Sequence, residues 1–178
     1  EKKMSSFPVI GLGASAGGIQ ALQTFFDDMP GDSGLAFVVV MHLAPDHESN
    51  LAQVIQQRTT MPVLQIHEAV QVAPNHVYVI PPNATLSIAH GKLKLQRRVE
   101  TGGHRSIDLF LESLARDQGK RAIGVILSGT ASDGTLGLEA IKAEAGITFA
   151  QDESAKYDSM PRSAIGAGCV DFVLSPEN

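Results

Sequence analysis

The chain has 178 residues, of which 43% are hydrophobic and 19% charged, so its length and composition match one globular domain and exclude a disordered chain. A net charge of −5 argues against nucleic-acid binding, which needs a basic stripe. One cysteine excludes a disulfide framework and a cysteine-rich zinc site, and no apolar run reaches the roughly 20 residues of a membrane span. We expect residues 1–6 to be a tail or linker, and residues 7–178 to be one domain cut from a larger multidomain protein.

Apolar runs alternate with amphipathic segments in the first part of the chain. Apolar residues at helical spacing predict a helix over 17–29, and a second helix is expected over 46–58 with Asp46 as its N-cap. Continuous apolar runs are typical of strands that are covered on both faces. They predict strands over 8–12, 35–41 and 61–66.

The middle of the chain differs from the segments on either side of it. Short runs with a His90-Gly91 turn predict an antiparallel hairpin insert made of 77–80, 85–89 and 92–96. The alternation then resumes, with Ser106 expected to cap one helix and Gly146 to close another. The expected helices cover 106–119, 134–145 and 161–167, and the expected strands cover 122–127, 147–150 and 170–174.

This order of elements predicts an α/β fold. Repeated strand–helix units indicate a doubly wound, mostly parallel sheet with helices on both faces, a Rossmann-like arrangement of three layers. In such sheets the site lies outside the carboxyl ends of the strands, near a switch in strand order. The loops that follow strands, and so are expected at this edge, include 11–18, 41–47 and 128–134.

The first of these loops matches two fingerprints. Gly11, Gly13 and Ala16 fit the dinucleotide-binding turn G-x-G-x-x-[G/A]. Gly13, Ser15 and Gly17 fit the nucleophile elbow G-x-S-x-G, which exposes a serine hydroxyl on a sharp strand-to-helix turn. A glycine-rich turn that binds nothing is the third possibility.

A dinucleotide site needs an acidic residue at the end of the second strand, where it holds the ribose hydroxyls. His42 stands at that position, and Asp32 lies in the turn before the strand. The pattern therefore counts against NAD, and we expect no cofactor.

A nucleophile elbow needs a base and an acid that orients the base. His42 follows the next strand on the same edge and is the candidate base, with His47 as an alternative. Asp133, in the loop after a later buried strand, is the candidate acid, although an aspartate before glycine is often a plain turn or cap residue. We expect His42 Nε2 within about 3–4 Å of Ser15 Oγ, with Asp133 on the other ring nitrogen.

Other polar residues carry weaker hypotheses. The six histidines form no H-E-x-x-H motif and no cluster with cysteine, so we expect no metal. Cys169 precedes an apolar strand and is expected to be a small core residue. Arg105 and Arg162 are surface arginines that could recognise an anionic substrate.

Several blocks of the sequence, taken together and in order, resemble a known family. They are Gly13-Ala14-Ser15 with Gly17-Gly18, the His42 loop, His104-Arg105-Ser106, Leu127-Ser128-Gly129 with Asp133-Gly134, and Ala150-Gln151 with Met160-Pro161-Arg162. From about Pro8 to about Leu174, the chain resembles the CheB-type protein-glutamate methylesterase domain of bacterial chemotaxis.

The resemblance implies a cytoplasmic serine hydrolase that removes methyl esters from receptor glutamates and possibly deamidates receptor glutamines. It places the catalytic serine, histidine and aspartate on Ser15, His42 and Asp133, and we assign the oxyanion donors to the backbone N–H groups of Ala16 and Thr130. It also implies a methyl-accepting receptor or signalling protein as substrate, and receiver, methyltransferase or sensor domains in the parent protein.

The chain departs from the commoner family pattern. Ala16 stands where a threonine is common, Thr130 where a methionine is common, and the loop after His42 carries Asp46. These changes leave the three expected catalytic residues intact. They also leave open a degenerate module that binds a partner without turnover.

Overall fold

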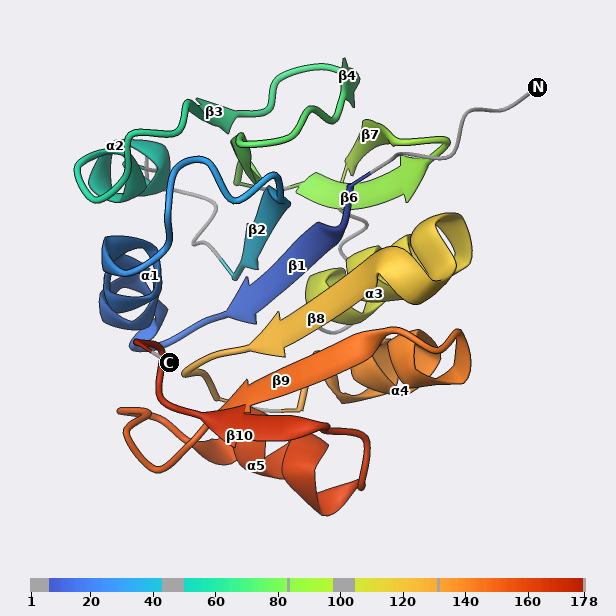
Figure 1. The fold of residues 1–178 in the computed structure, drawn as a ribbon. Helices are drawn as coiled ribbons and strands as arrows, with labels where there is room; N and C mark the ends of the chain where they lie inside the picture. The colour runs from blue at the N-terminus through green and yellow to red at the C-terminus, as the bar shows by residue number, and fades with distance from the viewer. Residues whose placement is uncertain (1–6, 43–49, 83, 98–104, 131, 178) are drawn as a thin grey trace.

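The computed structural model describes residues 7–42, 50–82, 84–97, 105–130 and 132–177, and confirms the predicted α/β fold (Figure 1). Its main sheet is parallel, with the strand order β10-β9-β8-β1-β2-β5-β3. These strands are β1 (Val9–Ala14), β2 (Ala36–Met41), β3 (Val63–Gln65), β5 (Val77–Val79), β8 (Ala122–Ile126), β9 (Ile147–Gln151) and β10 (Phe172–Leu174).

Helices cover both faces of this sheet. The helices are α1 (Gly18–Asp27), α2 (Leu51–Gln56), α3 (Ser106–Gln118), α4 (Thr135–Ala143) and α5 (Ser159–Gly166), with a 3-10 turn at Gly119–Arg121. Buried residues of α1 and α2 belong to one hydrophobic cluster, and those of α3, α4 and α5 to the other. In β2, Val38 faces the α3 side and Val39 the α1 side, because successive side chains of a strand alternate between faces. This explains why the strand sequence is apolar at every position.

A second sheet, with the order β4-β7-β6, is antiparallel. Its strands are β4 (Val70–Gln71), β6 (Ala84–Ala89) and β7 (Lys92–Arg97). The β6–β7 hairpin is the predicted insert, but the prediction that 77–80 belongs to it is wrong. Val77–Val79 is β5, which pairs in parallel with both β2 and β3 in the main sheet.

The end of α4 also corrects an expectation. Gly146 was expected to be the left-handed closing residue, but Ala145 has that conformation, with φ of 66°. The N–H groups of Ala145 and Gly146 donate to Lys142 and Ile141, in the pattern of a Schellman motif. A side chain at position 146 would lie 2.5 Å from the carbonyl oxygen of Ala122, so the glycine is needed for close packing.

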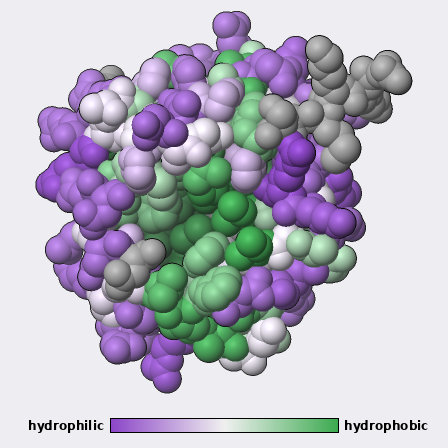
Figure 2. Space-filling model, in the orientation of Figure 1, coloured by the Kyte–Doolittle hydropathy of each residue, from purple (hydrophilic) through white to green (hydrophobic). Residues whose placement is uncertain are grey.

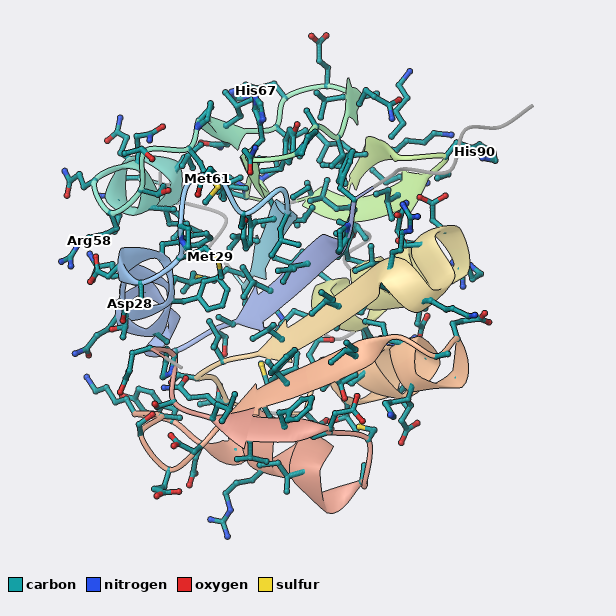
Figure 3. The ribbon with its side chains drawn as sticks, viewed as in Figure 1. Asp28, Met29, Arg58, Met61, His67 and His90 are labelled. Carbon is teal, nitrogen blue, oxygen red and sulfur yellow. The ribbon has the colours of Figure 1, made fainter. Side chains whose placement is uncertain are left out.

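The α1 side of the sheet has a hollow (Figure 2). Its volume is about 250 Å³ and its lining includes Phe25, Met29, Val125 and Phe149. Figure 3 shows Met29 at the C-terminal end of α1, next to this part of the sheet. Within the described ranges, no helix is both long and apolar enough to span a bilayer.

The strand order reverses direction around β1, which lies between β2 and β8. The chain runs outward from β1 to β2 on one side, and from β8 through β9 to β10 on the other. Ligand sites of doubly wound sheets lie at the carboxyl side of such a reversal. The loops after β1, β2 and β8 therefore meet where a site is expected.

Candidate active site

Ser15 follows β1 directly and lies in a strand–turn–helix corner. The turn is closed by the N–H of Gly18, which donates to the carbonyl of Ser15 at 2.8 Å, and Gly17 has a left-handed φ of 76°. Glycine is the residue that takes this conformation without a steric cost. The predicted strand–turn–helix corner is therefore present before α1, but Ser15 is only 6% exposed, so the expected exposure of its hydroxyl is not found.

The loop after β8 holds Ser15 from the opposite side. The backbone N–H of Ser15 donates to the carbonyl of Ser128 at 3.0 Å, and its Oγ accepts from the N–H of Thr130 at 3.0 Å. A Cβ at Gly129 would lie 2.5 Å from Ser15 Oγ and 2.9 Å from the Sδ of Met160. The serine hydroxyl is thus packed against a backbone segment that leaves no room for a side chain.

His42 stands directly after β2 and is paired with Asp133. Its backbone N–H donates to the carbonyl of Ala14, which places it beside the residue that precedes Ser15. Its Nε2 lies 2.7 Å from Asp133 Oδ2. The exposed fractions of the two side chains are 17% and 1%. The structure therefore brings together the predicted base and the predicted acid.

The contact corrects the expected use of the imidazole nitrogens. We expected Asp133 on Nδ1, with Nε2 free for Ser15, but Asp133 takes Nε2. An ionised carboxylate only accepts hydrogen bonds, so this geometry assigns the proton to Nε2 of neutral His42. The basic nitrogen of that tautomer is Nδ1.

Asp133 is anchored by the start of α3. Its Oδ2 also accepts from the N–H of Ile107 at 3.0 Å, and its Oδ1 accepts from the N–H of Asp108 at 2.8 Å. It therefore caps a helix, but one that is remote in sequence. Ser106 was expected to cap α3, but it is the first residue of the helix. Arg105, at the N-cap position, makes no capping bond with its side chain. Asp133 takes that role because the first N–H groups of a helix lack partners within it.

Asp108 is a buried carboxyl that our sequence reasoning missed. Its Oδ1 accepts from the N–H groups of Gly134 at 2.9 Å and Gly137 at 2.8 Å, so it caps α4. Burial raises the pKa of Asp108 to about 6; the Gly137 and Gly134 hydrogen bonds oppose this rise and the charge of Asp133 adds to it. An acidic residue in a first helical turn is ordinarily explained by the helix dipole, so the sequence carried no stronger signal.

Ser128 and Gln151 support the serine loop and were also missed. Gln151 Oε1 accepts from the N–H of Ser128 at 2.8 Å. Ser128 Oγ donates to the carbonyl of Ala16 at 2.8 Å and accepts from the N–H of Tyr157 at 3.1 Å. These bonds join the loops after β1, β8 and β9. They hold the backbone that directs the Thr130 N–H at Ser15.

Other predicted residues lie apart from this group or outside the described residues. His47 and Asp46 belong to the part that is not described. Arg105 lies 3.6 Å from Glu112, and Arg162 lies 3.6 Å from Asp158; both arginine side chains are more than half exposed, and their role in substrate recognition stays a prediction.

His67, His90 and Cys169 do not extend the site, and His104 lies outside the described residues. Figure 3 shows His90 beyond the N-terminal ends of β1 and β8, and His67 on the segment between β3 and β4. Cys169 is buried, as a core residue should be. In the ranges the structure describes, no three His, Cys, Asp or Glu side chains are grouped so that they could hold a metal ion.

Comparison with known proteins gives a consistent result. The family model "CheB methylesterase" matches residues 10–178. A protein of Leptospira interrogans, named putative protein-glutamate methylesterase/protein-glutamine glutaminase, is 34% identical over 97% of this chain and 91% of its own length. A Pseudomonas aeruginosa protein-glutamate methylesterase/protein-glutamine glutaminase is 32% identical over 98% of this chain and 51% of its own length. This chain thus spans about half of the Pseudomonas protein.

A solved structure supports the same relationship. The crystal structure of the Thermotoga maritima CheB methylesterase catalytic domain superposes with a TM-score of 0.86 at 27% sequence identity. The match covers 97% of this chain and 95% of the Thermotoga chain. The likeness therefore extends over the complete α/β sheet.

Proposed function

The chain belongs to the CheB methylesterase family, and from this premise we propose that it is a serine hydrolase that removes methyl esters from glutamate side chains of chemoreceptors. In this proposal Ser15 is the nucleophile, His42 the base and Asp133 the residue that orients the base. The observation that carries the proposal is the contact of 2.7 Å between His42 Nε2 and Asp133 Oδ2, at the edge of the sheet where Ser15 follows β1.

Acylation is proposed to proceed through these three groups. Ser15 Oγ attacks the ester carbonyl while His42 Nδ1 takes the hydroxyl proton. Asp133 stabilises the imidazolium that forms, because its carboxylate already holds the Nε2 proton. The tetrahedral intermediate collapses when His42 returns the proton to the methoxy oxygen, and methanol leaves.

Deacylation uses the same groups. His42 accepts a proton from water, the hydroxide attacks the glutamyl–Ser15 ester, and the proton returns to Ser15 Oγ as the glutamic acid leaves and releases its own proton to water. For a glutamine side chain, the first leaving group is ammonia in place of methanol. The names of the relatives include both activities, and we propose deamidation as a second reaction of the same site.

We propose that the backbone N–H groups of Ala16 and Thr130 donate hydrogen bonds to the oxyanion. Thr130 supports this assignment because its N–H already lies 3.0 Å from Ser15 Oγ, next to the position where the new bond forms. Ala16 is exposed at the corner before α1. Backbone donors do not depend on side-chain identity, so Ala16 and Thr130 can serve although the family commonly has threonine and methionine there.

The biological setting is proposed from the family. We place the protein in the cytoplasm, with a methyl-accepting receptor as substrate, and take residues 7–178 as one catalytic domain of a larger protein, preceded by a tail or linker. Its partner modules would be receiver, methyltransferase or sensor domains. The Pseudomonas relative is about twice as long as the region it shares with this chain, which fits a multidomain parent, whereas the Leptospira relative is matched over 91% of its length, which fits a single domain.

The dinucleotide alternative gains no support at this edge. The residue after β2, where an acid should hold the ribose, is His42, and this side chain is paired with Asp133. Saturable micromolar binding of NAD(H) in calorimetry would revive that alternative.

The test of the proposal is methanol release from methylated chemoreceptor by the wild-type chain and by Ser15→Ala. We expect the variant to lose activity by at least about 10³-fold, because the nucleophile is absent. Ser87→Ala, in β6 of the second sheet, is the matched control and should keep wild-type activity. Methanol release that is unchanged in Ser15→Ala, or absent in the wild type while receptor still binds, would favour the degenerate binding module.

A further inference from the structure

We propose that Asp108 is a positioning residue for the reaction, because it holds Asp133 in its contact with His42. The inference rests on the proposed function, in which His42 is the base and Asp133 orients it. Asp108 itself is not proposed to touch the substrate. Its action on the reaction passes through Asp133.

The two aspartates cap each other's helices. The side chain of Asp133 accepts from the backbone of Asp108 at the start of α3, and the side chain of Asp108 accepts from Gly134 and Gly137 at the start of α4. Both residues are buried, with exposed fractions of 4% for Asp108 and 5% for Asp133. The ends of α3 and α4 are thereby joined by reciprocal side-chain-to-backbone bonds.

This reciprocity fixes the rotamer of Asp133. Its Oδ1 is held by the N–H of Asp108, and its Oδ2 by the N–H of Ile107, which leaves Oδ2 directed at His42. Asp133 precedes Gly134, whose N–H is held by Asp108 Oδ1 and whose φ is 102°. Removal of the Asp108 carboxyl therefore frees the peptide next to Asp133, and we expect the Asp133 carboxylate to leave its position.

Burial and the negative charge of Asp133 raise the pKa of Asp108, whereas the N–H groups of Gly137 and Gly134 that bond to it oppose this rise. Asp133 faces Asp108, and His42 lies behind Asp133. On the other parts of the two helices, Arg105 is near Glu112, Lys142 pairs with Asp171, and Glu139 is exposed. With its pKa raised to about 6 by burial, Asp108 carries its charge in most molecules at pH 7 and above.

Asp117 offers a matched control on the same helix. Its carboxylate also accepts two backbone N–H groups, from His90 at 2.6 Å and Gly91 at 3.0 Å. These groups belong to the β6–β7 turn and not to the site. Asp117→Ala therefore removes a similar pair of hydrogen bonds from α3 without affecting Asp133.

The experiment compares Asp108→Ala, Asp108→Asn and Asp117→Ala in the full chain, with two readouts. The first is kcat and KM for methanol release from methylated receptor. The second is the proton NMR resonance of the imidazole N–H between His42 and Asp133, assigned by its loss in His42→Ala. The resonance is measured on the free protein, so it judges the role of Asp108 even if the wild type releases no methanol and the proposed function fails.

We expect Asp108→Ala to lower kcat at least about tenfold with KM changed less than twofold, and to shift or abolish the resonance. Asp108→Asn should keep kcat within about threefold and retain the resonance, because its amide oxygen can accept from Gly134 and Gly137. Asp117→Ala should match the wild type in both readouts.

The inference is overturned if Asp108→Ala keeps both kcat and the resonance, if Asp117→Ala loses them equally, or if Asp108→Asn is as impaired as Asp108→Ala. Circular dichroism establishes that each variant is folded. If Asp108→Ala is not, Asp108→Ser, which removes the carboxyl but keeps a small polar side chain, takes its place under the same criteria.

Discussion

Asp133 Oδ2 lies 2.7 Å from His42 Nε2, although the two residues are 91 positions apart in the chain. The contact forms because β8 and β2 flank β1 and all three strands end at one edge of the sheet. Asp133 is also buried, and it caps α3 by accepting from the backbone N–H groups of Ile107 and Asp108. The same carboxylate thus serves the fold and the proposed reaction.

Asp133→Asn should impair both catalysis and stability. Activity should fall by about 10⁴-fold, because the amide can present an N–H to His42 and favour the wrong tautomer. The free energy of unfolding should fall by about 1 kcal/mol, since one of the two oxygens that accept from α3 is replaced by an amide group that cannot accept. Methanol release and urea unfolding measure the two effects. Asp158→Asn, on an exposed side chain, should change neither, and an Asp133→Asn variant with wild-type activity would remove Asp133 from the mechanism.

Gly129→Ala should inactivate the site without unfolding the domain. The added methyl group would lie 2.5 Å from Ser15 Oγ and press on Met160, so the hydroxyl must leave its position. We expect kcat to fall about 100-fold, as is typical when a reacting atom is displaced by about 1 Å. Gly166→Ala is the control, because a Cβ there meets no atom within 4 Å. Equal activity of the two variants would show that the packing at Gly129 is not required.

Ser128→Ala should loosen the loop that holds Ser15. The hydroxyl bonds to Ala16 and Tyr157, and its loss leaves their backbone groups without these partners. We expect a loss of about 1–2 kcal/mol, which lowers Tm by about 2–8 °C in a chain of this length, together with a reduced kcat. Thermal unfolding followed by circular dichroism gives the shift. Ser87→Ala, at a half-buried position in β6, removes no hydrogen bond of the serine loop and should lower Tm less than Ser128→Ala does.

Asp108 should make stability fall as pH rises. Its folded-state pKa of about 6 lies above the ordinary value of 3.8, so the folded protein binds the proton more tightly. The stability that this proton contributes is fully present below the ordinary value and is lost as pH rises through about 6. Each unit of difference corresponds to about 1.4 kcal/mol, which makes the total effect at most about 3 kcal/mol.

Asp108→Asn removes this titration and provides the measurement. Urea unfolding between pH 4 and 7 should show the wild type losing stability relative to the variant as pH rises, with most of the change complete by about pH 7. A difference between the two proteins that stays constant over this range would contradict the assignment.

The alternation of strands and helices could be predicted because the local signals were strong. Continuous apolar runs marked the strands of the parallel sheet, and the loops after β1, β2 and β8 supplied Ser15, His42 and Asp133. The exceptions were β4, a strand of two residues that was not predicted, and β5, a strand of three residues next to the hairpin that was assigned to the wrong sheet. The apolar residues of β5 fit either sheet, and only pairing with β2 and β3 placed it in the main one.

The contacts of the buried carboxylates could not be predicted. The Asp-Gly pair at Asp133 is compatible with an ordinary turn, and Asp108 is compatible with a favourable charge in a first helical turn. Their mutual capping depends on how α3 and α4 pack together. No local sequence pattern predicts which N–H group, remote in the chain, will donate to a buried carboxylate.

By itself, the sequence determined the fold class, most of the order of elements and the loops that carry the proposed nucleophile, base and acid. These properties follow from hydrophobic periodicity and glycine-rich turns, which act over a few residues. The tertiary structure alone decided that Nε2 of His42 faces Asp133, that Asp133 caps α3 and that Asp108 secures it. Those choices depend on burial, because a carboxylate removed from water must take its hydrogen bonds from whichever groups the packing brings near.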